Sequence, residues 1–401
     1  MSEIATVTVA GPHPPLPRPP LLLVDQLAVS FPAGKRWVQV VRGASLAVRR
    51  REIVGLVGES GSGKSLTALA VLRLVPPPGR VAGRVLLDGE DLLALPEREL
   101  RRVRGARIGM VFQEPMAALD PVYTIGFQIA EAVAAHRTLP RRAALAEAAR
   151  LLDRVRLAGA RRLLGDYPHQ LSGGQRQRAM LAMALAAGPD LLLADEPTSA
   201  LDVTLQAQIL DLLGELRAEL GLAVLLISHD LAVVAASCDR VVVFYAGQVV
   251  EEAPAAALFA APAHPYTRGL LAALPRLGRP VGRGRLPVLA GQPPEPASRP
   301  SGCAFHPRCP EAMAVCALRE PELGPPASPT AGAGSGAETA MASEQRAVRC
   351  WLHVEPGKRP GASEQIAPST PDSARSTPGN AGATRSEPGA ARSTAGAQGA
   401  A

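Results

Sequence analysis

The sequence predicts an α/β fold in which a largely parallel sheet carries a phosphate-binding loop. Over residues 21–274, apolar runs of strand length alternate with longer helical segments. One apolar run, residues 51–57, leads into the glycine-rich stretch 58–65, and a helical pattern follows. Another run, residues 191–195, ends in a carboxylate. A strand, a glycine-rich turn and a helix in this order are typical of nucleotide-binding domains.

The glycine-rich stretch has the spacing G-x-x-x-x-G-K-[ST], which lets the backbone wrap around a phosphate. Lys64 is one of only three lysines against forty arginines, so this position keeps a compact ammonium where a planar guanidinium would not fit. The Ser65 hydroxyl is expected to bind Mg²⁺. A chance glycine-rich turn is the simpler alternative, but the flanking strand and helix favour a P-loop NTPase. The residues expected to bind the nucleotide here are Gly58, Glu59, Ser60, Gly61, Ser62, Gly63, Lys64, Ser65 and Leu66.

The other elements follow from the same two periodicities. Alternating or continuous apolar runs predict strands at residues 21–31, 40–48, 52–57, 84–89, 107–112, 191–195, 223–228 and 240–247. Helical periodicity predicts helices at residues 65–75, 125–135, 141–155, 175–187, 203–220 and 231–236. Helical patterns dominate residues 115–187, so we expect a helical subdomain within a domain that covers residues 21–274.

The flanking segments differ in composition from this domain. Residues 1–20 are rich in proline and predict a disordered leader, and residues 275–300 predict a linker. Residues 301–354 form a short C-terminal segment that holds four of the five cysteines. Residues 355–401 are low-complexity Ala, Gly, Ser, Thr and Pro, which cannot bury enough apolar surface to fold. We therefore expect a disordered tail.

Bulk composition excludes some classes of protein. No run approaches the ~18 uninterrupted apolar residues of a membrane-spanning helix. The first residues lack the basic start and apolar run of a signal peptide, so we expect a cytoplasmic protein without structural disulfides. The net charge of +7 comes from scattered arginines. This charge is compatible with an anionic partner but does not identify which kind.

Two carboxylates mark the end of the strand predicted at residues 191–195. Asp195 is placed to organise Mg²⁺, and Glu196 is placed to orient or deprotonate an attacking water. Acidic pairs at strand ends are common, but this pair accompanies a phosphate-binding loop. The combination predicts nucleotide hydrolysis.

The stretch LSGGQRQR, which begins at Leu171, indicates which family of nucleotide-binding proteins the chain resembles. Ser172, two glycines and a helix start present a hydroxyl, backbone N–H groups and a helix dipole to an anion. Read alone, this is an ordinary helix cap. Between the glycine-rich loop and the acidic strand, it makes the chain resemble the nucleotide-binding subunit of an ATP-binding-cassette (ABC) transporter over about residues 21–274.

The resemblance implies a dimer with two ATP molecules between its subunits. The residues that would contact the ATP of the partner subunit are Ser172, Gly173, Gly174, Gln175 and Asp202. Phe31 fits the aromatic residue that stacks on adenine in the family, and Trp37 competes for that role.

The resemblance also assigns catalytic roles. Gln113 would touch Mg²⁺ and the attacking water, and His229 would contact the γ-phosphate. The expected catalytic residues are therefore Glu196, His229 and Gln113. The expected Mg²⁺ ligands are Ser65, Gln113 and Asp195.

A finer resemblance is to the oligopeptide/dipeptide importers of bacteria, a group that includes nickel importers. Residues 111–131, 167–178, 264–276 and 302–310 carry it. It implies a peripheral ATPase on the cytoplasmic side of the inner membrane that drives peptide import. Expected partners are two permease subunits, a paralogous second ATPase subunit and, indirectly, a substrate-binding protein, but no nucleic acid. Importers of nickel or another small solute, and ABC ATPases outside transport, are the alternatives.

Cys303, Cys309, Cys316 and Cys350 form the second candidate site. Gathered thiolates suit a soft metal or an iron–sulfur cluster, and their spacing differs from the close pairs of a zinc ribbon. The pattern resembles the module that holds a [4Fe–4S] cluster in this family, although the stretch before Cys350 is longer than expected. Zinc, with His306 or His353 as a substitute ligand, and free thiols remain alternatives.

Overall fold

The structure is a computed structural model that describes residues 19–199, 201–274, 289–326 and 346–354. Its strands are β1 (Leu22–Ala33), β2 (Arg36–Val48), β3 (Ile53–Val57), β4 (Arg80–Leu87), β5 (Glu90–Asp91), β6 (Ile108–Val111), β7 (Leu191–Asp195), β8 (Ala223–Ser228), β9 (Arg240–Tyr245), β10 (Gln248–Pro254) and β11 (Ala347–Val348). The tail predicted at residues 355–401, residues 1–18 of the predicted leader and residues 275–288 of the predicted linker lie outside the described residues.

Helices connect and cover these strands. They are α1 (Lys64–Val71), α2 (Glu97–Val103), α3 (Pro115–Ala118), α4 (Ile125–Ala134), α5 (Arg141–Arg154), α6 (Ala160–Leu163), α7 (Gly173–Ala184), α8 (Val203–Leu220), α9 (Leu231–Ser237), α10 (Ala255–Ala260), α11 (Pro265–Ala272) and α12 (Ala314–Leu318). The 3-10 turns are η1 (Pro168–Gln170), η2 (Pro296–Ser298), η3 (His306–Arg308) and η4 (Trp351–His353).

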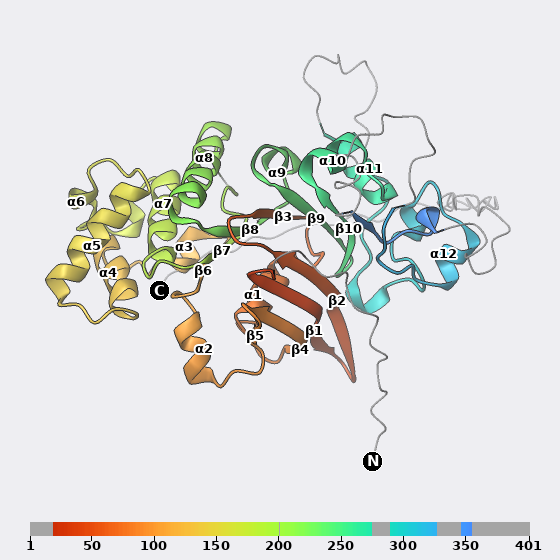
Figure 1. Ribbon diagram of the computed structural model, residues 1–401, viewed down its shortest axis with the longest axis horizontal. Coiled ribbons are helices and arrows are strands. Elements are labelled where there is room, and N and C mark those ends of the chain that lie inside the picture. Colours follow the sequence, from red (N-terminus) through yellow and green to blue (C-terminus); the bar gives the residue numbers. More distant parts are fainter. Residues whose placement is uncertain (1–18, 200, 275–288, 327–345, 355–401) are drawn as a thin grey trace, which may run out of the picture. The chain divides into compact units, whose positions relative to one another are not determined.

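The strands of the described residues form two sheets (Figure 1). The larger has seven strands in the order β11-β10-β9-β3-β8-β7-β6, and the smaller has four in the order β2-β1-β4-β5. The strands from β9 to β6 pair in parallel, whereas every pair in the smaller sheet is antiparallel. Parallel pairing puts the carboxyl ends of these strands along one edge, where ligands bind in open α/β sheets.

The larger sheet is buried on both faces. Leu191 and Leu193 of β7 pack with α1 and the smaller sheet, whereas Leu192 and Ala194 pack with α7 and α8. Successive side chains of a strand point to opposite faces, so a strand covered on both sides is a continuous apolar run. This explains why LLLAD could be recognised as a strand without any polar alternation.

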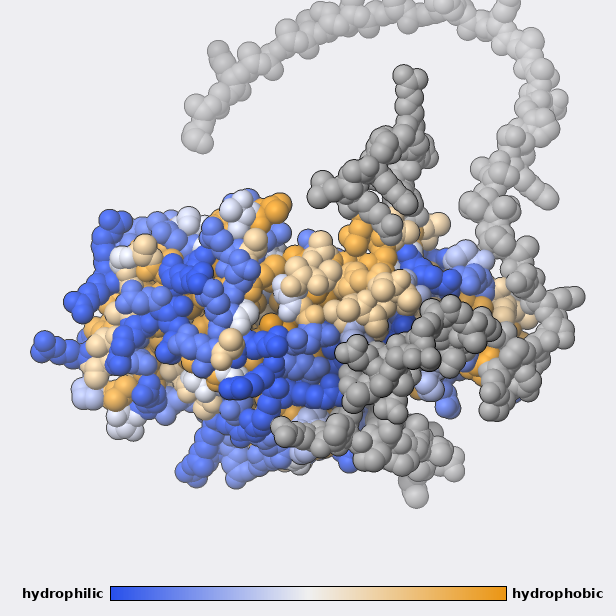
Figure 2. All heavy atoms as spheres, turned by 45° about the horizontal axis from the view of Figure 1, so that its top comes forward, coloured by the Kyte–Doolittle hydropathy of each residue, from blue (hydrophilic) through white to orange (hydrophobic). Residues whose placement is uncertain are grey.

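Helices α4, α5 and α7 pack against one another through a third layer of apolar side chains. The Thr124 hydroxyl caps α4 by accepting a hydrogen bond from the N–H of Phe127 at 3.3 Å. Figure 2 shows mostly hydrophilic side chains over the outer surface of this part, in keeping with the exposed arginines of α5 and α6. The boundaries of a helical subdomain at residues 115–187 stay a prediction.

All six helices expected from periodicity are present, with ends that differ by at most four residues. The largest difference is in α1, which ends at Val71 rather than at residue 75. Arg73 has a φ of 51°, and the prolines at residues 76–78 follow. A left-handed residue and nearby prolines cannot continue a helix.

Strand β10 was not expected, because Glu251 and Glu252 give its sequence a polar character. A tight turn determines it: Ala246 and Gly247 have φ values of 47° and 86°, and Tyr245 pairs with Gln248. Two positive φ values between paired strands are typical of a type I′ hairpin. The turn uses Ala-Gly rather than the common Asn-Gly, so its sequence signal was weak.

The cysteine-containing segment packs on the edge of the larger sheet. Its β11 pairs with β10, and Phe305 lies against the rings of Tyr245 and Tyr266 at centroid distances of 5.3 and 5.4 Å. Phe305 and Tyr266 are buried, so this contact contributes about 2 kcal/mol or more of apolar stabilisation. No helix in the described stretches has both the length and the apolar character needed to cross a membrane.

Candidate functional site

The predicted catalytic groups meet at the carboxyl edge of the parallel strands. The glycine-rich loop, residues 58–63, leaves β3 in the middle of the sheet. Asp195 ends β7 and Glu196 follows it, His229 follows β8, and Gln113 lies just beyond β6. Because β3, β8, β7 and β6 are neighbours in this order, residues far apart in sequence converge here.

Two glycines of the loop are required by its geometry. A Cβ at Gly58 would lie 2.1 Å from the carbonyl oxygen of Phe244, so no side chain fits there. Gly63 caps α1 with a φ of 106°, in the region that favours glycine. The loop therefore delivers the first N–H groups of α1 to the site, an arrangement that favours an anion.

Lys64 is held on the backbone of the loop itself. Its ammonium donates to the carbonyl oxygens of Gly58 at 2.7 Å and Glu59 at 3.0 Å, and the residue is 5% exposed. Burial lowers the pKa of Lys64, and the negative charges of Glu196, Asp195 and Glu59 oppose that shift. The site thus keeps a cation next to three carboxylates.

Ser65 and Asp195 are direct partners. The Ser65 hydroxyl donates to Oδ1 of Asp195 at 2.9 Å. Burial raises the pKa of Asp195, and the hydrogen bond from Ser65 acts in the opposite direction. A hydroxyl and a carboxylate placed together in this way form a hard oxygen site, which Mg²⁺ prefers.

Glu196 lies between Gln113 and His229. Gln113 Nε2 donates to Glu196 Oε2 at 3.1 Å, and His229 Nδ1 lies 3.1 Å from Glu196 Oε1. Glu196 has a φ of 47°, in the left-handed region that glutamate rarely adopts. Such strain is concentrated at functional sites, where the surrounding structure holds it in place. The backbone N–H of Glu196 donates to the carbonyl oxygen of Ile227 at 3.0 Å, which helps to hold it.

The LSGGQ turn forms a complete capping box at the start of α7. The Ser172 hydroxyl accepts from the N–H of Gln175 at 3.3 Å, and the Gln175 side chain accepts from the N–H of Ser172 at 2.9 Å. Asp202 caps α8 in the same manner, accepting from the N–H of Leu205 at 3.0 Å. Ser172, Gly173 and Asp202 are exposed, as contacts with a second subunit would require.

The two aromatic candidates for stacking on adenine differ in environment. Phe31 is partly buried and packs beside Val75 and Gly79. Trp37 is 42% exposed, and the guanidinium carbon of Arg80 lies 3.8 Å from its ring centroid. The role of Phe31 stays a prediction.

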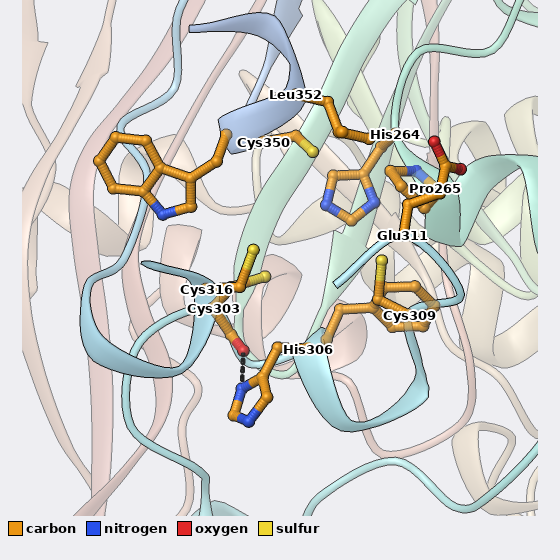
Figure 3. Close-up of a pocket in the computed structure, with 11 residues that line it drawn as sticks. His264, Pro265, Cys303, His306, Cys309, Glu311, Cys316, Cys350 and Leu352 are labelled. Atoms are coloured by element: carbon orange, nitrogen blue, oxygen red, sulfur yellow. Dashed lines mark hydrogen bonds between the residues drawn. The ribbon is translucent and has the colours of Figure 1, made fainter. Parts of the chain in front are cut away.

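The four C-terminal cysteines line one pocket. Figure 3 shows the side chains of Cys303, Cys309, Cys316 and Cys350 pointing into the same space, with the His264 ring beside them. Burial raises the pKa of Cys303 and Cys350 to about 12 and that of Cys309 to about 11. Ligands of a metal must lose these protons. Within the described residues, no group of three or more His, Cys, Asp or Glu side chains is arranged to hold a metal ion.

The cysteine segment also touches the glycine-rich loop, which the sequence did not indicate. Arg308 of η3 forms a two-pronged ion pair with Glu59, at 2.7 and 2.9 Å. The backbone N–H of Glu59 donates to the hydroxyl of Tyr266 at 3.0 Å. The sequence places these residues almost 250 positions apart, and only packing of the segment on the sheet brings them together.

Comparison with known proteins places this site in a family. A family model described as ABC transporter matches residues 41–199, and one described as the C-terminal region of oligopeptide/dipeptide transporters matches residues 250–316. A peptide import ATP-binding protein of Brucella abortus (strain 2308) is 50% identical over 303 residues, covering 75% of this chain and 91% of that protein. The chain belongs to the ABC transporter family.

Other matches agree with this assignment. A peptide ABC transporter ATP-binding protein of Sinorhizobium fredii is 49% identical over 312 residues, covering 77% of this chain and 92% of that protein. The dimeric structure of a bacterial ABC transporter cassette is 29% identical, with a TM-score of 0.53, and covers 58% of this chain and 98% of the cassette. A second structure of that cassette is a post-hydrolysis state bound to ADP and Pi. This chain is therefore an ABC ATPase, an enzyme that uses ATP and Mg²⁺.

The second family model covers part of the cysteine pocket. The matched residues 250–316 include α11 and three of the four cysteines. Cys350 lies beyond the match, yet it lines the same pocket as the other three. The structure therefore brings Cys350 to the site across the long intervening stretch.

Proposed function

We propose that this chain is the ATP-hydrolysing motor subunit of an importer for oligopeptides or dipeptides. The observation that carries the proposal is the position of Glu196, held between Gln113 and His229 at the carboxyl edge of the sheet. The names of the relatives and the match to an oligopeptide/dipeptide transporter C-terminal region support the peptide cargo.

The site residues have different roles in hydrolysis. The loop and Lys64 hold the outer phosphates. Ser65, Asp195 and Gln113 would hold a Mg²⁺ ion, which would neutralise charge on the phosphates when bound. Glu196 orients the attacking water and accepts its proton as the water oxygen bonds to the γ-phosphorus and the bond to ADP breaks. His229, beside Glu196, would contact the γ-phosphate. A partner subunit completes each site with its Ser172–Gln175 turn and Asp202.

The segment after Gln113 is the proposed docking site for the permease. It exposes Met116 (47%), Val122 (70%) and Tyr123 (47%), and Phe112, just before Gln113, is 39% exposed. The carbonyl oxygen of Gln113 accepts from the Ser199 hydroxyl at 3.2 Å, which links this segment to the loop after Glu196. Movement of a docked permease would therefore reach the catalytic carboxylate directly.

We propose the following organisation around this motor. A leader at residues 1–20 precedes an ATPase domain at residues 21–274, and residues 301–354 form the cysteine module. Two permease subunits and a paralogous second ATPase hold the chain on the cytoplasmic face of the inner membrane, and a substrate-binding protein delivers the cargo. No nucleic acid takes part.

We further propose that the cysteine pocket holds a [4Fe–4S] cluster. Four thiols lining one pocket are the ligand set that such a cluster needs. Zinc held by the same thiols is the alternative. His264 closes one side of the pocket, and burial lowers its pKa to about 3, so it stays neutral beside the thiols.

Reconstitution of the complete transporter in lipid vesicles tests the function. ATP-dependent uptake of labelled di- and pentapeptides is expected with the natural chain and not with Glu196→Gln. Uptake of nickel without uptake of peptides would assign the chain to the nickel importers. ATP hydrolysis that is indifferent to the permease would favour an ABC ATPase outside transport.

A further inference from the structure

The second residue of the glycine-rich loop is neutralised by the cysteine segment. Nη1 and Nη2 of Arg308 donate to the two carboxylate oxygens of Glu59 at 2.7 and 2.9 Å. The Arg308 side chain is only 5% exposed, whereas that of Glu59 is 25% exposed. Two-pronged pairs of this kind fix orientation as well as charge, and lysine cannot reproduce them.

Other N–H groups of Arg308 are also engaged. Its Nε donates to the carbonyl oxygen of Ala290 at 2.9 Å, and Nη1 also donates to the Tyr245 hydroxyl at 3.3 Å. Arg308 ends the η3 turn, and Cys309 of the cysteine pocket follows it directly. These contacts hold the guanidinium in place while η3 is ordered, and Cys309 is joined to it through the adjacent backbone.

Charge at Glu59 matters because the loop binds a polyanion. The negative charge of Glu59 acts on Lys64, together with those of Asp195 and Glu196. Without Arg308, an uncompensated carboxylate would stand at the phosphate-binding loop and repel the phosphates. The N–H of Glu59, fixed on the Tyr266 hydroxyl at 3.0 Å, keeps the residue from turning away.

We propose that Arg308 is a positioning residue of the ATP site, through which the cysteine segment sets how tightly the loop holds ATP. The proposal rests on the proposed ATP-binding role of residues 58–65. It predicts that an ordered cysteine pocket keeps Arg308 on Glu59 and affinity high, and that a disturbed pocket releases Arg308 and lowers affinity.

Substitution of Arg308 in the full-length chain tests the link. Arg308→Met should raise Kd for Mg-ATP about tenfold, or ~1.4 kcal/mol, and raise KM similarly with kcat nearly unchanged. The matched control is Arg319→Gln, which replaces an exposed arginine at the end of α12 in the same segment and should leave both constants unchanged. Thermal unfolding of each variant shows whether it is folded.

A double substitution separates charge from folding. Glu59→Gln combined with Arg308→Met removes the repelling carboxylate, so Kd should return to within about twofold of the natural value. A role of Arg308 in folding alone predicts a double variant no better than the single one, and that result would overturn the proposal. An unchanged Kd in folded Arg308→Met would overturn it as well.

A second pair of variants tests the connection to the pocket. Cys309→Ser should raise Kd for Mg-ATP severalfold in the natural chain and have no further effect in the Arg308→Met background. Equal effects in both backgrounds would show that the pocket does not act through Arg308. Lys64→Ala tests the ATP-binding role of residues 58–65 separately. If this variant binds ATP normally, the assignment of the ATP site is wrong, whatever the effect of Arg308.

Discussion

The nucleotide site and the cysteine pocket are built in different ways. In the nucleotide site, each catalytic side chain follows a strand of one parallel sheet, so strand order alone brings Asp195, Glu196 and His229 together. In the pocket, Cys316 comes from the short helix α12 and the other three cysteines come from loops and turns, with Cys350 far along the chain from the rest. A sheet edge positions residues through its hydrogen bonds, whereas loops depend on side-chain packing such as that of Phe305.

Loss of the Glu196 carboxylate tests the first half of this comparison and should have the largest effect. Glu196→Gln should lower kcat about 10²–10⁴-fold, because the group that orients and deprotonates water is gone. ATP binding, measured by equilibrium titration, should persist. The exposed carboxylate of α2 provides the control Glu97→Gln, which should hydrolyse ATP normally. Full turnover by Glu196→Gln would remove Glu196 from the mechanism.

Metal analysis tests the second half. Protein purified without oxygen should contain iron and acid-labile sulfide in near-equal amounts, and Cys350→Ser should lose both. Cys238→Ser is the matched control, since Cys238 is a free cysteine packed against the core and away from the pocket. Zinc alone in the natural chain, or iron retained by Cys350→Ser, would contradict the proposed ligand set.

The ion pair between Glu52 and Arg240 tests how much such a contact at the larger sheet stabilises the protein. Burial alone would raise the pKa of Glu52, but the hydrogen bond and charge of Arg240 lower it below 4.5 overall. A carboxyl whose pKa is lowered by folding stabilises the protein above its unfolded pKa, and that stability is lost as pH falls. Glu52→Gln should therefore cost ~2 kcal/mol at pH 7, and the deficit should shrink below about pH 4.5. Denaturant unfolding of both proteins across this pH range measures it; a constant deficit would contradict the linkage.

The adenine contact should give the smallest effect. Phe31→Leu keeps apolar packing beside Val75 but removes the aromatic face, so KM for ATP should rise about tenfold. Trp37→Leu, on the exposed neighbouring position, should leave KM nearly unchanged. The opposite result would transfer the stacking role to Trp37.

Much of the sheet and the nucleotide site could be predicted from the sequence. Residues 191–195 are recognisable because burial on both faces demands an uninterrupted apolar run, and the glycine-rich loop because phosphate binding fixes its spacing. Strand β10 was missed because its hairpin turn uses Ala246 where Asn would be expected. The ion pair of Arg308 with Glu59 could not be predicted, because it depends on how Phe305 seats the segment on the sheet and leaves no local pattern.

The backbone of Glu196 has a consequence for the evolution of this chain. A φ of 47° suits glycine or asparagine better than glutamate, so replacing Glu196 by glycine should relieve strain and raise the melting temperature. Selection for thermostability alone would therefore favour chains that no longer turn over ATP. Stability alone does not explain a glutamate in this conformation, whereas a role in ATP hydrolysis does.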